Sequence, residues 1–124
     1  GGIAIHVPVG WAISQGYEKI VVVRTRDKDY KASKEYSDTL IKMLYKNRFP
    51  KMAEKLRFNS FLYNKEVDKL NTLEKKGRIH MIAPSRRLEL TLFCNDLEEL
   101  ADLYYLGLND MNERIQDLKR YLEG

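Results

Sequence analysis

The sequence is poor in the residues that build disulfides, metal sites and rigid loops: it holds 1 cysteine, 2 histidines, 3 prolines and 1 tryptophan. The single cysteine, Cys94, excludes a disulfide within the chain and is typical of a reducing compartment, so we expect a cytoplasmic protein. Neither His6 nor His80 has a pair of acidic residues at ligand spacing, which argues against a metal site. We therefore expect no metal and no other cofactor.

Long apolar runs are absent as well. No segment approaches the roughly 18 consecutive apolar residues that a membrane-spanning helix needs, and no signal peptide is visible. The composition, 44% hydrophobic and 32% charged, is typical of a soluble globular protein. A chain of 124 residues buries about two-thirds of its unfolded surface, so we expect residues 1–124 to form one domain or a large part of one.

The net charge of +4 conceals an asymmetry along the chain. Residues 24–87 hold 18 lysines and arginines against 8 acidic residues, a balance of +10, and the remaining residues have a balance of −6. A basic segment attracts the phosphates of nucleic acids or of anionic lipid headgroups, unless it is simply a solvated region with scattered lysines. No nucleic-acid-binding motif is recognisable, so a basic nucleic-acid-binding module is the weakest alternative and no nucleic acid is expected as a partner.

The first quarter of the chain carries the clearest pattern. Gly1-Gly2 allows a sharp turn, Pro8 suits the first turn of a short helix, and Gly16 suits its left-handed cap. The following segment, Lys19–Thr25, contains four consecutive β-branched residues. An unbroken apolar run of this length predicts a strand that is covered on both faces, as in a parallel sheet.

The middle of the chain predicts a long helical connection to a second strand. Tyr36-Ser37-Asp38 offers a helix cap, and the apolar residues Leu40, Met43, Leu44 and Tyr45 then follow at helical spacing. Pro50 suits the start of a new helix that continues to Lys75 and is capped by Gly77. The apolar segment Arg78–Ala83, which Pro84 closes, is the second strand. Two strands joined by a helical crossover are expected to be parallel and right-handed.

The last third predicts an edge strand and two helices. The segment Arg86–Phe93 alternates leucines with polar residues, which favours a half-buried extended segment. Asn95-Asp96 caps a helix with acidic residues in its first turn. We expect Gly107 to break this helix, and Asn109-Asp110 to begin a last one whose apolar stripe comprises Met111, Ile115, Leu118 and Leu122. The predicted class is therefore α/β, with about two parallel strands, a long helical crossover and two C-terminal helices.

The order of residues in the first quarter is more specific than its periodicity. The residues that carry this specificity are Gly1-Gly2-Ile3, Val7-Pro8-Val9, Ala12, Gly16-Tyr17, Lys19-Ile20-Val21-Val22-Val23 and Thr25-Arg26. This string closely resembles the bacterial patatin-like phospholipases. Weaker matches follow at Phe49-Pro50, Tyr63-Asn64, Leu73–Gly77 and Ile82–Ser85. The resemblance implies that the chain is the C-terminal part of a patatin-like three-layer α/β/α fold.

The resemblance also implies an activity and a site. In that family a serine–aspartate dyad hydrolyses acyl esters, and the two glycines directly follow the catalytic aspartate in a D-G-G motif. Gly1 and Gly2 carry over as the backbone of the turn that holds this aspartate, so the chain is expected to begin one residue after it. The serine in its G-x-S-x-G turn and the oxyanion loop would lie upstream. Ser14 lacks the first glycine of that motif and is not taken as a nucleophile.

Four other residues are weaker candidates for contacts with a pocket or a lipid headgroup. His6 follows the glycine turn, although such a residue is more often an ordinary turn histidine. Ser85 follows Pro84 at the end of the second strand, where α/β sheets commonly place ligands, but without a nearby base it reads equally as a turn hydroxyl. Arg86 and Arg87 are suited to a headgroup phosphate.

The sequence therefore predicts the C-terminal part of a patatin-like serine acyl hydrolase, a phospholipase or esterase, that is inactive on its own. Its expected partner is a phospholipid or another acyl ester, and the basic, aromatic-rich crossover is a candidate lid or membrane-facing surface. A non-catalytic interaction domain of the same fold is the alternative. We also expect self-association, because the strand Lys19–Thr25 would lack a neighbour on one side.

Overall fold

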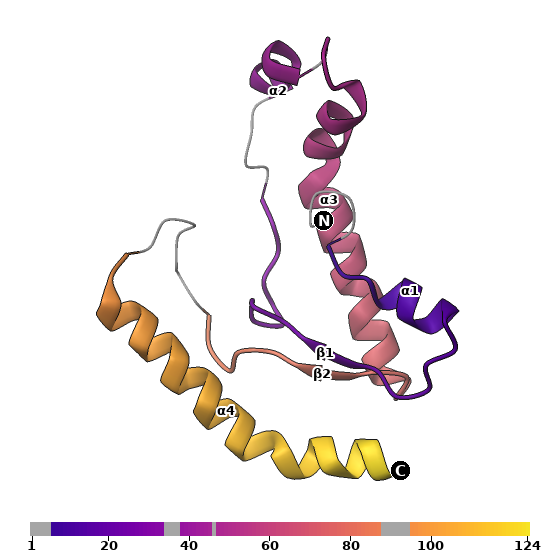
Figure 1. Ribbon diagram of the computed structural model, residues 1–124, viewed down its shortest axis with the longest axis vertical. Coiled ribbons are helices and arrows are strands. Elements are labelled where there is room, and N and C mark those ends of the chain that lie inside the picture. The colour runs from indigo at the N-terminus through magenta and orange to yellow at the C-terminus, as the bar shows by residue number, and fades with distance from the viewer. Residues whose placement is uncertain (1–5, 34–37, 46, 88–94) are drawn as a thin grey trace. The chain divides into compact units, whose positions relative to one another are not determined.

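The structure is a computed structural model that describes residues 6–33, 38–45, 47–87 and 95–124 (Figure 1). In chain order its elements are α1 (Val9–Ser14), β1 (Val21–Val23), α2 (Asp38–Tyr45), α3 (Pro50–Lys75), β2 (His80–Ile82) and α4 (Leu97–Glu123). The chain divides into a first unit, Gly1–Tyr17 with Lys31–Lys76, and a second unit, Glu18–Tyr30 with Gly77–Gly124. The mixture of helices with a parallel pair of strands confirms the predicted α/β class at this coarse level.

In the first unit, α1 begins and ends where its local signals predict. Pro8 precedes the first helical residue, Val9 is buried, and Gly16 adopts the left-handed backbone with a φ of 83°. The chain just before α1 is tied to α3, since the backbone N–H of Val7 donates to a carboxylate oxygen of Glu66 at 3.2 Å. The short helix is therefore bounded by proline and glycine and anchored by one long-range hydrogen bond.

The predicted helix over Leu40–Tyr45 is confirmed as part of α2. Its buried residue is Ile41, which is only 2% exposed, whereas Leu40, Met43 and Leu44 are exposed. The helix has few turns, and its apolar residues spread over more than one side. In such a helix the spacing of apolar residues does not select a face, and packing against α3 does.

The long helix α3 confirms its predicted boundaries. Pro50 is its first residue, and Gly77 follows its C-cap with a φ of 69°. Its buried residues are Ala53, Val67 and Leu70. The side chain of Asn64 also holds the loop at Ala32, because it accepts a hydrogen bond from the backbone N–H at 2.8 Å and donates to the carbonyl oxygen at 3.0 Å.

In the second unit, β1 and β2 lie side by side and are parallel, as predicted (Figure 1). Val21 is opposite His80, Val22 opposite Met81 and Val23 opposite Ile82. The expectation that β1 is covered on both faces is wrong, because Val23 is 72% exposed. Within the described residues the sheet has two strands, so β1 has a paired neighbour at one edge.

The C-terminal helix α4 is one continuous element of 27 residues. Gly107 does not break it, and Asn109-Asp110 does not begin a new helix, so both predictions were wrong. The predicted start is confirmed, since the Asp96 side chain caps the helix by accepting a hydrogen bond from the N–H of Glu98 at 2.9 Å. A glycine within a helix costs only about 1 kcal/mol relative to alanine, which the contacts of Asp110 described below offset.

Several sequence predictions fall outside the described residues. These are the glycine turn at Gly1-Gly2, the cap at Ser37, most of the extended segment Arg86–Phe93, and Cys94. Among the helices that the structure describes, none combines the length and the apolar character needed to cross a membrane.

Candidate functional site

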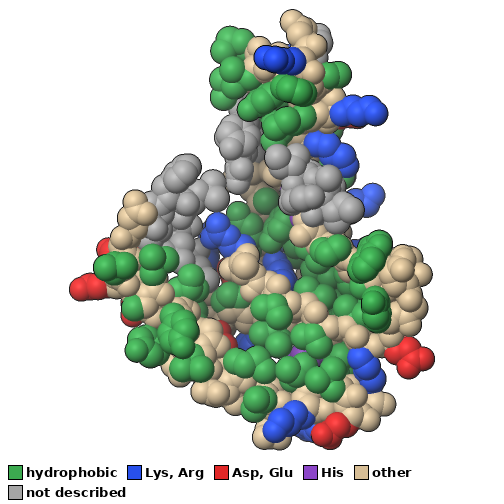
Figure 2. Space-filling model, in the orientation of Figure 1, with side chains coloured by type: hydrophobic (Ala, Val, Ile, Leu, Met, Phe, Trp, Pro, Cys, Tyr) green, Lys and Arg blue, Asp and Glu red, His purple; other side chains and the backbone are tan. Residues whose placement is uncertain are grey.

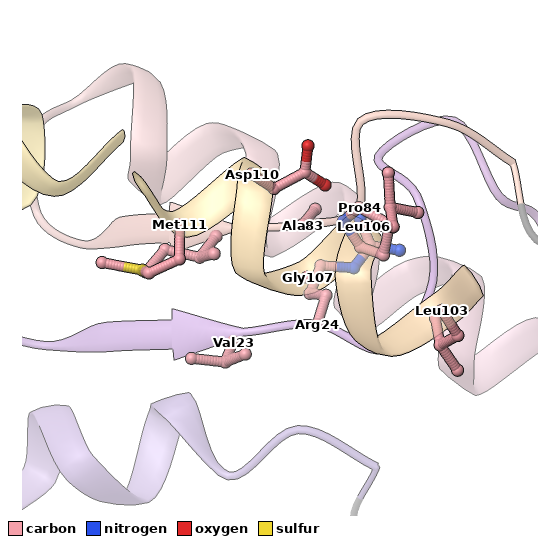
Figure 3. Close-up of a pocket in the computed structure, with 10 residues that line it drawn as sticks. Val23, Arg24, Ala83, Pro84, Leu103, Leu106, Gly107, Asp110 and Met111 are labelled. Atoms are coloured by element: carbon pink, nitrogen blue, oxygen red, sulfur yellow. The ribbon is translucent and has the colours of Figure 1, made fainter. Parts of the chain in front are cut away.

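A cavity of about 290 Å³ lies in the second unit, where the carboxyl ends of β1 and β2 face the middle of α4 (Figure 3). We call it the α4 pocket. It is lined by Val23, Arg24, Ile82, Ala83, Pro84, Leu103, Leu106, Gly107, Asp110 and Met111. Eight of these ten residues carry no polar side-chain group. The carboxyl end of parallel strands is also the place where α/β sheets commonly bind ligands.

The acidic member of the pocket wall is Asp110, which is only 6% exposed. Its carboxylate accepts a hydrogen bond from the backbone N–H of Ser85 at 2.8 Å. Burial raises the pKa of Asp110, but hydrogen bonds from the Ser85 side chain and backbone and the charges of Arg114 and Arg86 outweigh it, so the pKa is lowered. Asp110 is therefore ionised at neutral pH and is a weak base.

A second side chain of α4 holds the same loop. The guanidinium of Arg114 donates to the carbonyl oxygen of Ala83 at 2.9 Å. Asp110 and Arg114 lie four residues apart, on one side of the helix, and each binds the backbone just after β2. The end of β2 is thus fixed to α4 by one acceptor and one donor.

Arg24 is the basic member of the pocket wall and is also buried. Its backbone N–H continues the ladder by donating to the carbonyl oxygen of Ile82 at 2.8 Å. Its guanidinium donates to the carbonyl oxygen of Lys28 at 3.4 Å. A buried cation beside an apolar cavity suits a ligand with an apolar body and an anionic or carbonyl end.

The opposite end of the sheet is closed by Tyr121 near the end of α4. Its hydroxyl accepts a hydrogen bond from the N–H of Ile20 at 3.0 Å and lies 3.3 Å from the carbonyl oxygens of Ile20 and Arg78. Its ring stacks on His80, with the ring centroids 5.3 Å apart, and the Lys19 ammonium lies 5.0 Å from the ring centroid. His80 is therefore a packing residue, and α4 is fixed to the sheet at both strand ends.

The structure brings together only part of the predicted site. Ser85 and Arg86 both act on Asp110 beside the α4 pocket. Arg87 is exposed. His6 belongs to the first unit, where its ring meets that of Tyr63 edge-to-face, with the centroids 5.7 Å apart. Gly1 and Gly2 lie outside the described residues.

Comparison with known proteins places the chain in a family. Residues 49–123 match the family described as a domain of unknown function, DUF6363. The chain belongs to this family. The matched residues include α3, β2 and α4, and hence Ser85, Asp110 and Arg114. No curated protein and no solved structure matches the chain.

Sequence reasoning missed Asp110, Arg114 and Arg24 as parts of the site of this DUF6363 chain. A signal for Asp110 was present, because it continues the helical spacing of Leu103 and Leu106, which places a carboxylate on an otherwise apolar stripe. The expected helix break at Gly107 interrupted this spacing, because Asp110 was then interpreted as part of the cap of a new helix. No comparable signal marked Arg24, which directly follows the valines of β1.

Proposed function

We propose that this DUF6363 chain is the C-terminal part of a patatin-like serine acyl hydrolase that acts on a phospholipid or a simpler ester. The observation that carries the proposal is the apolar α4 pocket at the carboxyl ends of two parallel strands. In the whole enzyme an upstream serine attacks the ester carbonyl, and the alcohol leaves. Water then releases the acid from the acyl-enzyme. The role of this chain is to form a wall of the pocket that receives the acyl group.

The size and lining of the pocket support an acyl group. Its volume of about 290 Å³ lies just below the range of about 300–1,000 Å³ that is usual for ligand pockets. An apolar wall favours a hydrocarbon chain over a sugar or a nucleotide, which would leave polar groups unpaired. Arg86 and Arg87 follow the pocket residue Pro84 after one intervening residue, Ser85. Their guanidinium groups are suited to a lipid phosphate, which would bring the enzyme to a membrane surface.

Asp110 and Ser85, the polar groups that meet beside the α4 pocket, do not make a catalytic centre. A carboxylate whose pKa is lowered is a poor general base at neutral pH, and the Ser85 backbone and side chain are engaged with Asp110. We therefore expect residues 1–124 alone to be inactive. In the whole enzyme Gly1 and Gly2 shape the turn that holds the catalytic aspartate, as the resemblance implies.

The test compares ester hydrolysis by the protein extended upstream with hydrolysis by residues 1–124. We expect activity on p-nitrophenyl esters and phospholipid vesicles in the extended form alone. A folded but silent extended form would contradict the proposal and favour the non-catalytic interaction domain. Activity of residues 1–124 would also contradict it, because the nucleophile would then have to lie in this chain.

A pocket variant tests the role of the α4 pocket in the extended protein. No atom lies within 4 Å of the position of a Cβ on Gly107, so Gly107→Leu enters the pocket without a backbone clash. We expect it to lower kcat/KM for esters of long acyl chains more than tenfold and that for acetate esters little. Asn109→Leu adds the same side chain at an exposed position of α4 and serves as the control. Equal effects of Gly107→Leu on short and long esters would show that the α4 pocket does not bind the acyl chain.

A further inference from the structure

The continuity of α4 through Gly107 creates an apolar stripe that neither predicted helix would have had. Its residues follow one another at alternating distances of four and three positions. They are Leu97, Ala101, Tyr104, Leu108, Met111, Ile115, Leu118 and Leu122. We call this stripe the α4 seam.

Most of the α4 seam is exposed. Leu97 is 80% exposed and Tyr104 68%, and Leu108, Ile115 and Leu122 are also exposed. Figure 2 shows hydrophobic side chains on the surface of the region that α4 occupies in Figure 1. The side of α4 that meets the sheet carries Asp110, Arg114 and Tyr121. Of the seam residues, Met111 also lines the α4 pocket on that side. The seam is thus apolar surface that the contacts within the second unit leave largely uncovered.

The spacing of the α4 seam identifies the kind of partner it fits. An apolar four–three alternation that is sustained over more than three heptads is typical of a coiled-coil seam. The alternation runs without interruption from Leu97 to Leu122. A second helix with the same spacing is the natural occupant of such a seam. We propose that α4 pairs with α4 of a second copy of this chain.

The charges beside the seam favour the antiparallel orientation. With the two helices antiparallel, Leu97 lies opposite Leu122 of the second copy and Leu108 opposite Met111, so apolar residues meet throughout. Glu98 then lies beside Lys119 of the second copy. By symmetry, Lys119 lies beside Glu98 of the second copy, so two attractions form. A parallel pair would separate Glu98 from Lys119 of the second copy by about three heptads and lose this attraction. Antiparallel helix dipoles add to the preference.

The first test measures the mass of the whole chain by light scattering and by sedimentation over a concentration series. We expect a dimer that dissociates on dilution. Leu108→Glu places a carboxylate at the centre of the seam, and we expect the dimer Kd to rise by at least about a hundredfold. Met43→Glu alters an apolar residue on α2 that is even more exposed, 75% against 46% for Leu108, and should leave the Kd unchanged. A dimer that survives Leu108→Glu would overturn the proposal.

A third variant separates the seam from pairing at the edge of the sheet. The Ile20 carbonyl and the Arg24 N–H bond to β2, so the N–H of Val23, an intervening residue, points to the other edge of β1. Val23→Pro blocks that edge without removing a bond to β2. The proposal expects the Val23→Pro protein to stay dimeric. A monomeric Val23→Pro protein beside a dimeric Leu108→Glu protein would show edge pairing instead.

Charge reversal tests the antiparallel orientation. We expect Glu98→Lys and Lys119→Glu each to raise the dimer Kd by about fivefold to tenfold, because each replaces two attractions by two repulsions. The double variant restores the opposite charges and should recover a Kd near that of the unaltered chain. Circular dichroism confirms that α4 stays helical in each protein. Failure of the double variant to recover the Kd would overturn this orientation.

Discussion

The carboxylate of Asp110 accepts a hydrogen bond from the backbone N–H of Ser85 at 2.8 Å, across 25 positions of the chain. Arg114, one turn later, donates to the carbonyl oxygen of Ala83. These two bonds fix the register of α4 against the end of β2 and so shape the α4 pocket. They also explain why α4 stays helical through Gly107, because the helix is held on the C-terminal side of the glycine.

Asp110→Asn should destabilise the fold. The variant removes a negative charge that receives hydrogen bonds and faces Arg114 and Arg86, and the loss of a hydrogen-bonded charge costs about 1–3 kcal/mol. The free energy of unfolding in urea measures the change. Asp117→Asn is the matched control, since Asp117 lies on the same helix and forms an exposed ion pair with Arg120, worth less than about 1 kcal/mol. Equal losses for the two variants would refute the anchoring role of Asp110.

Acid should remove the stabilisation that Asp110 provides. Its pKa in the folded protein is lowered from the ordinary value of 3.8, so the unfolded chain binds the proton first as the pH falls. The contribution is complete above the unfolded value and declines as the pH falls toward the folded pKa. Urea unfolding between pH 7 and pH 3 should show the stability difference between the unaltered protein and Asp110→Asn shrinking below about pH 4. If this stability difference grew as the pH fell, the predicted direction of the pKa shift of Asp110 would be wrong.

Gly107→Ala should stabilise the protein by about 0.5–1 kcal/mol, because alanine is the better helix former and its methyl group meets no neighbour. Gly16→Ala and Gly77→Ala should each destabilise it by about 1–2 kcal/mol, since their φ angles of 83° and 69° disfavour a side chain. Thermal unfolding compares the three variants. A loss of stability in Gly107→Ala would mean that the glycine is needed by a neighbour of α4.

Tyr121→Phe should destabilise the second unit by about 1–2 kcal/mol, because the N–H of Ile20 loses the Tyr121 hydroxyl as its hydrogen-bond acceptor. The ring and its stacking on His80 remain. Tyr105→Phe removes a hydroxyl from an exposed tyrosine of the same helix that lies outside the α4 seam and should change the stability by less than about 0.5 kcal/mol. Urea unfolding of both proteins measures the contrast. If the two variants were equally stable, Tyr121 would not anchor α4 through its hydroxyl.

The sequence predicted the elements whose boundaries depend on local chemistry. Pro8 and Pro50 mark the starts of α1 and α3 because a proline at a helix start loses no hydrogen bond. Gly16 and Gly77 mark helix ends because only glycine readily adopts the left-handed cap, and Asp96 caps α4 through its own side chain. The parallel pairing of β1 and β2 follows from the long connection between them.

Only the tertiary structure decided which apolar residues are buried and whether the last helix continues past Gly107. Ile41 is buried in place of Leu40, and Val23 is exposed in a strand of uniformly apolar sequence, because burial depends on which neighbours are present. Gly107 stays within α4 since Asp110 and Arg114 beyond it bind the loop after β2. A glycine is a weak local signal of about 1 kcal/mol, and contacts from residues 25 or more positions away are enough to override it. Such contacts carry no signature in the local sequence.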